Sequence, residues 1–206
     1  MRLLPLIFAT SLLGPMSLAA QDELTPPPTW QVRLDRPTAS RDDLYFVNMP
    51  PGWHITTGPA AILYDPARIG EGTFTIDSEI FQFPTHRVRE AYGIIFGGRA
   101  LEADGQAYVY FLIRGDGRFI VKARAGRTTE TLVPWTAHEA IVPRGPGEEN
   151  IKNELRVVAG AETVAFFVND TEVASLPRAG LECDGIVGLR VNHSVNLHVT
   201  NLDVTR

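Results

Sequence analysis

YGIIFGG at residues 92–98 and AYVYFLIRGDGRFIVKARAGRTTETLV at residues 107–133 decide the fold of this chain. The stretch contains three strand patterns joined by glycine turns. At its centre, two runs rich in β-branched and aromatic residues flank the short loop Gly115-Asp116-Gly117. Two such runs across a glycine loop are typical of a β-hairpin.

The register of this hairpin divides its residues into two faces, because side chains alternate across a strand. If Arg114 lies opposite Arg118, one face is apolar throughout and is predicted to face the core: Val109, Phe111, Ile113, Phe119, Val121 and Ala123. The other face is aromatic and basic: Tyr108, Tyr110, Leu112, Ile120, Lys122 and Arg124. We expect this second face to be the ligand surface.

The first twenty residues have the pattern of a secretory signal peptide. Arg2 precedes an apolar run over residues 3–13, and Ser17-Leu18-Ala19-Ala20 is a small-residue cleavage context. The run is too short to span a bilayer, so we expect cleavage after Ala19 or Ala20 and an exported protein, periplasmic or secreted. Residues 21–29 form a proline-rich linker, and residues 30–206 are expected to form one domain.

Composition excludes several classes of partner for the mature chain. Loss of Arg2 with the signal peptide leaves 18 basic against 24 acidic residues and a net charge of −6. Nucleic acids and anionic membrane surfaces select a basic footprint, so neither is predicted as a partner. Cys183 is the single cysteine, which excludes an internal disulfide, and we interpret it as a structural thiol. No pattern predicts an oligomeric state.

The remaining sequence continues the strand pattern at the spacing of a sandwich or barrel. Asn169-Asp170 predicts a two-residue hairpin, because both residue types tolerate positive φ. Asp65-Pro66 is expected to open a turn-rich connection, residues 140–142 to form a short strand, and residues 195–205 to form the closing strand. We predict an all-β jelly-roll sandwich of two antiparallel sheets with roughly 12–14 strands.

The order of these motifs resembles the concanavalin A-like lectin/glucanase superfamily. The motifs are YGIIFGG, AYVYFLIRGDGRFIV, TLVPWT, NELRVVAGAETVAFFVNDTEVASL, GIVGLRV and VNLHVTNLDVT, and they cover about residues 74–205. More narrowly, they resemble the bacterial exported domain of unknown function described as 3-keto-disaccharide hydrolase. The resemblance implies a concanavalin A-like jelly roll and a sugar substrate. It departs from the family at the closing strand, where Val195-Asn196-Leu197-His198 replaces the usual phenylalanine-arginine-asparagine motif.

The catalytic candidates are Asp77 and Glu79, in the run TFTIDSEIFQF. Glycosidases need a pair of carboxylates at a fixed separation, and these two residues share one strand face because they are two positions apart. Phe81 stands where the superfamily's glucanases have a third carboxylate. A polar stripe on a solvated sheet face explains the pair equally well.

Aromatic residues provide the predicted carbohydrate site. An exposed ring flanked by hydrogen-bonding groups is a natural platform for a sugar. We expect the platform residues to converge with Glu79 on one concave sheet, and they are Trp53, His54, Tyr108, Tyr110, Lys122 and Arg124. The alternative is that Trp53 and Trp135 fill the ends of the core.

The sequence predicts no cofactor and no metal site. The five histidines lack ligand spacing, and the loops of Asp65, Glu102, Asp104 and Asp116, where calcium is the alternative occupant, lack a dense acidic motif. The leading functional prediction is an exported, non-catalytic module that binds a saccharide or polysaccharide or another surface. The alternatives are a glycoside or 3-keto-disaccharide hydrolase and a structural exported protein without a small ligand.

Overall fold

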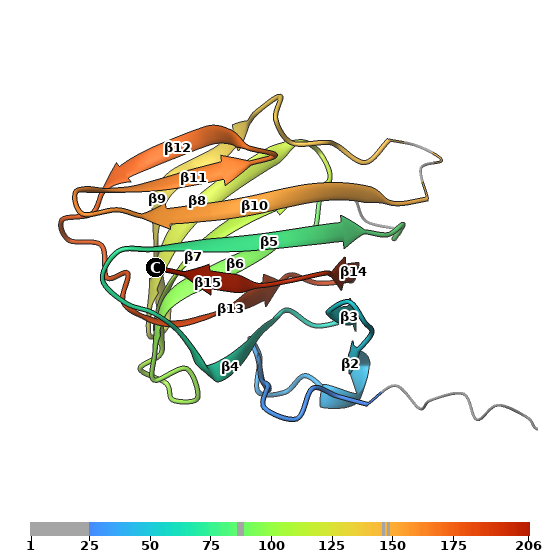
Figure 1. Ribbon diagram of the computed structural model, residues 1–206. Helices are drawn as coiled ribbons and strands as arrows, with labels where there is room; N and C mark the ends of the chain where they lie inside the picture. Colours follow the sequence, from blue (N-terminus) through green and yellow to red (C-terminus); the bar gives the residue numbers. More distant parts are fainter. Residues whose placement is uncertain (1–24, 86–88, 146, 148) are drawn as a thin grey trace, which may run out of the picture.

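A computed structural model describes residues 25–85, 89–145, 147 and 149–206 of the chain. The predicted signal peptide lies outside these residues. Within them, fifteen strands form two antiparallel sheets packed face to face, which confirms the predicted all-β sandwich (Figure 1). Across the same residues, the chain forms no helix long and apolar enough to cross a membrane.

The first sheet has seven strands and is built around the central hairpin. Its order is β1 (Gln31–Leu34), β4 (Ala61–Gly70), β13 (Gly185–Val191), β6 (Ala91–Arg99), β7 (Ala107–Arg114), β8 (Arg118–Ala125) and β9 (Thr128–Ala137). The predicted hairpin register is confirmed, since Arg114 pairs with Arg118 and Tyr110 pairs with Lys122. Gly117 has a φ of +76°, which suits glycine at this turn.

The second sheet has eight strands, drawn from both halves of the chain. Its order is β12 (Thr171–Pro177), β11 (Thr163–Val168), β10 (Ile151–Ala159), β5 (Phe74–Gln82), β14 (Val195–Val199), β3 (Trp53–Thr57) and β2 (Leu44–Asn48), with β15 (Asp203–Thr205) also paired to β5. A short 3₁₀ turn, η1 (Arg41–Asp43), precedes β2. The β11–β12 hairpin turns at Asn169 and Asp170, whose φ values of 49° and 62° confirm the predicted tight turn.

The main core lies between the sheets and is formed by their inward residues. Phe96, Phe111 and Phe166 meet at its centre, with ring centroids 5.2 and 6.3 Å apart. A second apolar cluster covers the outer face of the first sheet, and includes Ile62, Tyr64, Ile95, Tyr108, Tyr110, Leu112 and Ile120. The central strands of the first sheet, β6 and β7, are therefore buried on both faces, whereas β5 and β10 of the second sheet alternate between buried and partly exposed residues.

Three local predictions are wrong. A turn was expected at Asp65-Pro66, but strand β4 continues through it. The proline is tolerated because the pairing of β4 with β13 is interrupted at this point, so its missing N–H removes no hydrogen bond of the ladder. Residues 140–142 form a turn rather than a strand. The closing segment splits into β14 and β15 at residues 200–202, which brings the total to fifteen strands.

Candidate functional site

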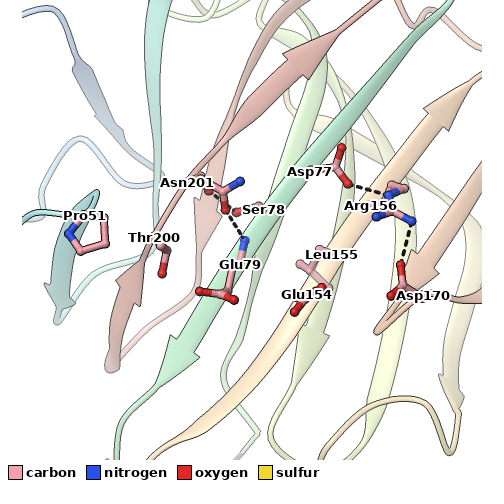
Figure 2. A pocket seen from close by; sticks show the side chains of 10 residues that line it. All are labelled: Pro51, Asp77, Ser78, Glu79, Glu154, Leu155, Arg156, Asp170, Thr200 and Asn201. Carbon is pink, nitrogen blue, oxygen red and sulfur yellow. Dashed lines mark hydrogen bonds and ion pairs between the residues drawn. The ribbon is translucent and has the colours of Figure 1, made fainter.

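An open groove of about 580 Å³ lies on the outer face of the second sheet (Figure 2). The alternation of β5 buries Ile76, Ser78 and Ile80 and turns Asp77 and Glu79 outward, onto its floor. Strand β10 supplies Glu154 and Arg156 beside them, because Glu154 pairs with Glu79 and Arg156 with Asp77. The remaining lining comes from Pro51, Ser78, Leu155, Asp170, Thr200 and Asn201.

A bulge between β14 and β15 shapes one wall of the groove. The Thr200 N–H donates to the Glu79 carbonyl at 2.9 Å. The Glu79 N–H then finds a side-chain acceptor, the Asn201 Oδ1, at 2.8 Å, in place of a ladder partner. The Asn201 Nδ2 donates in turn to Asp203 at 2.7 Å. Bulges of this kind re-aim side chains beside functional sites, and here one presents Thr200 and Asn201 to the groove.

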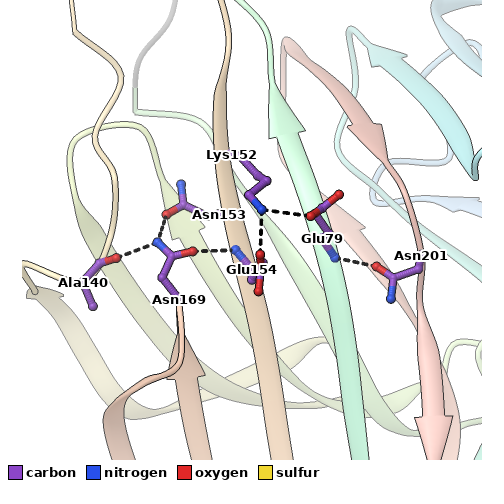
Figure 3. A network of polar contacts seen from close by, with 7 residues as sticks. All are labelled: Glu79, Ala140, Lys152, Asn153, Glu154, Asn169 and Asn201. Atoms are coloured by element: carbon purple, nitrogen blue, oxygen red, sulfur yellow. Dashed lines mark hydrogen bonds and ion pairs between the residues drawn. The ribbon is translucent and has the colours of Figure 1, made fainter.

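Two cations hold the groove's carboxylates in place (Figures 2 and 3). Arg156 donates to Asp77 at 2.5 Å and to Asp170 at 2.9 Å. Lys152 Nζ lies 3.0 Å from the Glu79 carboxylate and 2.7 Å from that of Glu154. The hydrogen bond from Lys152 lowers the pKa of Glu79 below its ordinary value. The ionised form of Glu79 is therefore favoured, and this carboxylate is poorly suited to donate a proton.

Buried amides connect the groove to the rest of the sandwich (Figure 3). The Asn169 Oδ1 accepts from the Glu154 N–H at 2.8 Å, and its Nδ2 donates to the Ala140 carbonyl and to Asn153. Asn153 is fully buried and also bonds both backbone groups of Val142. This network fixes the position of β10 relative to the β11–β12 turn, and with it the positions of Glu154 and Asp170.

The predicted tyrosine platform is not exposed, so that prediction is wrong. Tyr108 and Tyr110 are 2% and 6% exposed and belong to the apolar cluster on the first sheet. The alternation of side chains along β7 correctly placed the two tyrosines on the face opposite the core. It gives no information about which residues cover that face. Lys122 and Arg124 lie beside them on β8, paired with Tyr110 and Tyr108 respectively.

A partly buried ion pair between Arg190 and the more exposed Asp35 lies beside this tyrosine cluster. Arg190 is 6% exposed, forms two hydrogen bonds to Asp35 at 2.6 and 2.9 Å, and donates to the Tyr108 hydroxyl at 3.1 Å. Its guanidinium also lies 5.3 Å from the centre of the Tyr110 ring. Burial raises the pKa of Asp35, but the hydrogen bond and charge of Arg190 outweigh it, so the net shift is downward. Tyr108 thus accepts a hydrogen bond from Arg190, and the Tyr110 ring packs against the guanidinium of the Arg190–Asp35 ion pair.

Trp53, His54 and Glu79 lie in the second sheet, so the expected convergence of all candidates on one sheet is also wrong. Trp53 packs against the core with its ring 4.6 Å from that of Trp30, in line with the alternative that it fills one end of the core. Its neighbour His54 points the other way and lies on the same outer face as Glu79.

Sequence reasoning missed the other aromatic residues of this face. Phe81 follows Glu79 in the outward alternation of β5, and its ring lies 6.4 Å from that of His198. The signal was available, since Phe81 stands two positions beyond Glu79, but it was interpreted only as a missing carboxylate. Among the described residues, no three His, Cys, Asp or Glu side chains are grouped so that they could hold a metal ion.

Solved structures place this architecture among known proteins. The carbohydrate-binding module CBM66 from Bacillus subtilis superposes with a TM-score of 0.63 at 12% identity, over 89% of this chain and 97% of the module. The GH16 enzyme of the Bacteroides ovatus mixed-linkage glucan PUL, in complex with the product G4G4G3G, superposes with a TM-score of 0.61 at 5% identity, over 88% and 97%. The fold is a concanavalin A-like jelly roll.

A Bacillus subtilis protein of unknown function, described as having a galectin-like fold, superposes on the same jelly roll with a TM-score of 0.60 at 9% identity, over 85% of this chain and 88% of that one. No family model and no curated protein sequence matches the chain. The solved structures confirm the predicted jelly-roll fold. The resemblance to the superfamily, and more narrowly to the 3-keto-disaccharide hydrolase domain, stays a prediction.

Proposed function

We propose that this jelly roll binds a neutral saccharide in the groove over β5 and β10 and does not hydrolyse it. The observation that carries the proposal is an open groove lined with hydrogen-bonding side chains, several of which are held in place by ion pairs or hydrogen bonds to neighbouring residues of the sheet. Rigid polar groups of this kind can bind sugar hydroxyls without the entropy cost of ordering side chains on binding. The CBM66 module and the GH16 glucan complex support the choice of ligand class.

The charge of the groove favours a neutral sugar over an acidic one. Its lining carries four carboxylates, on Asp77, Glu79, Glu154 and Asp170, against the single guanidinium of Arg156. Lys152 lies close by and offsets part of this excess. A uronate or sulfated chain would meet like charge, which costs affinity at an interface.

The protonation of the groove supports binding rather than hydrolysis. Glycoside hydrolysis needs one carboxylic acid that keeps its proton near neutral pH, which requires a raised pKa. The pKa of Glu79 is shifted downward, and Asp77 is ion-paired with Arg156. If the hydrolase alternative held, reducing sugar or 3-keto-disaccharide turnover would appear with the unmodified protein and be lost in Glu79→Gln.

The test is isothermal titration with neutral mixed-linkage glucan fragments and with alginate fragments of equal length. Glu154→Ala removes a partly exposed groove carboxylate, and we expect at least about a tenfold loss of affinity for the neutral fragments, equal to about 1.4 kcal/mol. Glu130→Ala, on an exposed position of β9 in the other sheet, is the matched control and should leave affinity unchanged. Equal effects of the two variants, or tighter binding of alginate, would contradict the proposal.

We also propose that the protein acts outside the cytoplasm, as the segment of residues 1–20 predicts. Expression in a bacterial host followed by mass spectrometry of the periplasmic fraction tests this. The expected product begins at Ala20 or Gln21, and an intact Met1 in the cytoplasmic fraction would contradict export.

A further inference from the structure

A strip of aromatic side chains extends the groove along the seam between β5 and β14. His198 on β14 pairs with Phe81 on β5 on one side and with His54 on β3 on the other. The ring of His54 lies 5.9 Å from that of Phe83 and 6.3 Å from that of Tyr45. All five rings are partly exposed, and the most exposed residue is Tyr45 at 46%.

The strip joins the groove directly. The His198 Nε2 lies 2.8 Å from the carbonyl of Pro51, a residue of the groove wall. Since a carbonyl only accepts, this nitrogen carries the proton, which fixes the orientation of the imidazole ring. Glu79 precedes Phe81 on the same strand face, so the groove floor continues into the aromatic surface without an intervening element.

A second hollow lies at the far end of the strip. It measures about 390 Å³ and is lined by hydroxyl and amide residues that include Thr56, Thr85, Ser194 and Asn196. Thr56 pairs with Asn196 across β3 and β14, and the Phe83 N–H donates to the Asn196 carbonyl at 2.9 Å. Along one seam, the order is therefore a polar groove, an aromatic strip and a polar hollow.

We infer that this seam is a continuous track for an extended neutral oligosaccharide, a conclusion that rests on the proposed saccharide binding in the groove. From Asn196 to Asn201 the track covers five residue steps, about 17 Å at about 3.3 Å per residue. This is longer than a single sugar ring requires. The alternation of polar and aromatic groups matches a sugar chain, whose C–H faces stack on rings while its hydroxyls bond to the polar groups at each end.

The inference assigns separate roles to the parts of the track. The groove would hold the first two sugar units by hydrogen bonds to Glu79, Glu154 and Thr200. Phe81 and His198 would stack on the next unit, and Thr56 and Asn196 would bond a more distant one. Affinity should therefore depend on chain length, because a short fragment reaches only the groove.

The test is isothermal titration with fragments of mixed-linkage glucan, from the disaccharide to the hexasaccharide. We expect affinity to rise at least about tenfold along this series. Phe81→Ala should remove most of that rise and leave the disaccharide affinity within about twofold. Phe167→Ala, on a partly exposed β11 position that pairs with Arg156 on the side of the groove away from the seam, is the matched control and should keep the full rise.

A second variant keeps the test independent of the stability of Phe81→Ala. Thr56→Val removes the exposed hydroxyl that hydrogen-bonds to Asn196 and His54 beside the far hollow, and it should weaken the hexasaccharide alone. Equal affinity along the series, or an equal loss in Phe81→Ala and Phe167→Ala, would overturn the track while leaving groove binding intact. If fragments of every length fail to bind, the proposed function itself fails, and the track with it.

Discussion

Asn169 shows how much one side chain contributes at the tip of a hairpin. Its φ of 49° is a conformation that asparagine adopts more readily than most residues, and its side chain bonds to Glu154, Ala140 and Asn153. The sequence predicted the turn from the first property. The hydrogen bonds could not be predicted, because they join residues 15 and 29 positions away along the chain.

Substitution of Asn169 separates its two contributions. Asn169→Gly keeps the backbone conformation and loses the hydrogen bonds, so we expect about 2–3 kcal/mol lower stability in urea unfolding. Asn169→Ala should cost about 1 kcal/mol more, because it adds the strain of positive φ. Asp170→Gly, at the neighbouring turn position, is the control and should change stability little. Equal losses for Asn169→Gly and Asn169→Ala would contradict the account.

Asp35 makes the stability of the fold depend on pH. Its pKa in the folded chain lies below the ordinary value of 3.8, so its contribution is complete above that value and is lost as the pH falls through the folded pKa. Asp35→Asn should remove this acid-dependent part and cost about 1–3 kcal/mol at neutral pH, since it leaves the buried Arg190 without a charged partner while position 35 stays partly exposed to water. Urea unfolding from about pH 7 down to about pH 2 measures both effects.

The control for Asp35 is Asp104→Asn, which changes an exposed loop carboxylate. It should leave the dependence of stability on pH close to that of the unmodified protein. If Asp35→Asn loses stability in parallel with the unmodified protein at every acidic pH, the acid sensitivity arises from other groups.

At the scale of the element, strands were predictable where local pattern decides them. The register of the β7–β8 hairpin was predicted to the residue, since its turn glycines and its apolar alternation agree on one pairing. The prediction ended strand β4 too early, because Asp65-Pro66 is typical of a turn when only the local sequence is considered. The irregular pairing of β13 with β4 tolerates the proline, and pairing between distant strands is not visible in the local sequence.

The groove was missed for the same reason. Asp77 and Glu79 were identified as sharing a face, but the wall opposite them depends on the β14–β15 bulge, whose key contact joins residues 122 positions apart. The tyrosines were misjudged because alternation assigns a side chain to a face of its sheet. Whether that face is open depends on the loops and side chains that cover it, and here a second apolar cluster does so.

The bulge carries its own prediction. Asn201→Ala leaves the Glu79 N–H without its acceptor, so we expect about 1–3 kcal/mol lower stability and weaker binding of the groove disaccharide. Asp203→Ala removes only the partner of the Asn201 amide nitrogen and is expected to have a smaller effect on both properties. Urea unfolding and titration of the two variants make the comparison, and a larger loss in Asp203→Ala would show that the bulge is held in another way.

For the molecule as a whole, the two sheets have different outer surfaces. The first sheet is covered by its own tyrosines around Arg190 and Asp35, and it carries structural charge. The second sheet presents the groove and the aromatic strip to solvent. Because the main core separates these surfaces, stability should be adjustable on one sheet without changing ligand affinity on the other.

A double variant tests this separation. Asp35→Asn should lower the Tm and keep the hexasaccharide affinity of the unmodified protein at temperatures below unfolding, whereas Phe81→Ala should weaken the hexasaccharide. The effects should add in Asp35→Asn/Phe81→Ala to within about 0.5 kcal/mol. Hexasaccharide at about one hundred times its Kd should stabilise Asp35→Asn by about 2.7 kcal/mol, as for the unmodified protein. If the single variant Asp35→Asn bound the hexasaccharide more weakly than the unmodified protein, the two faces would be coupled through the core, and the separation argued here would be wrong.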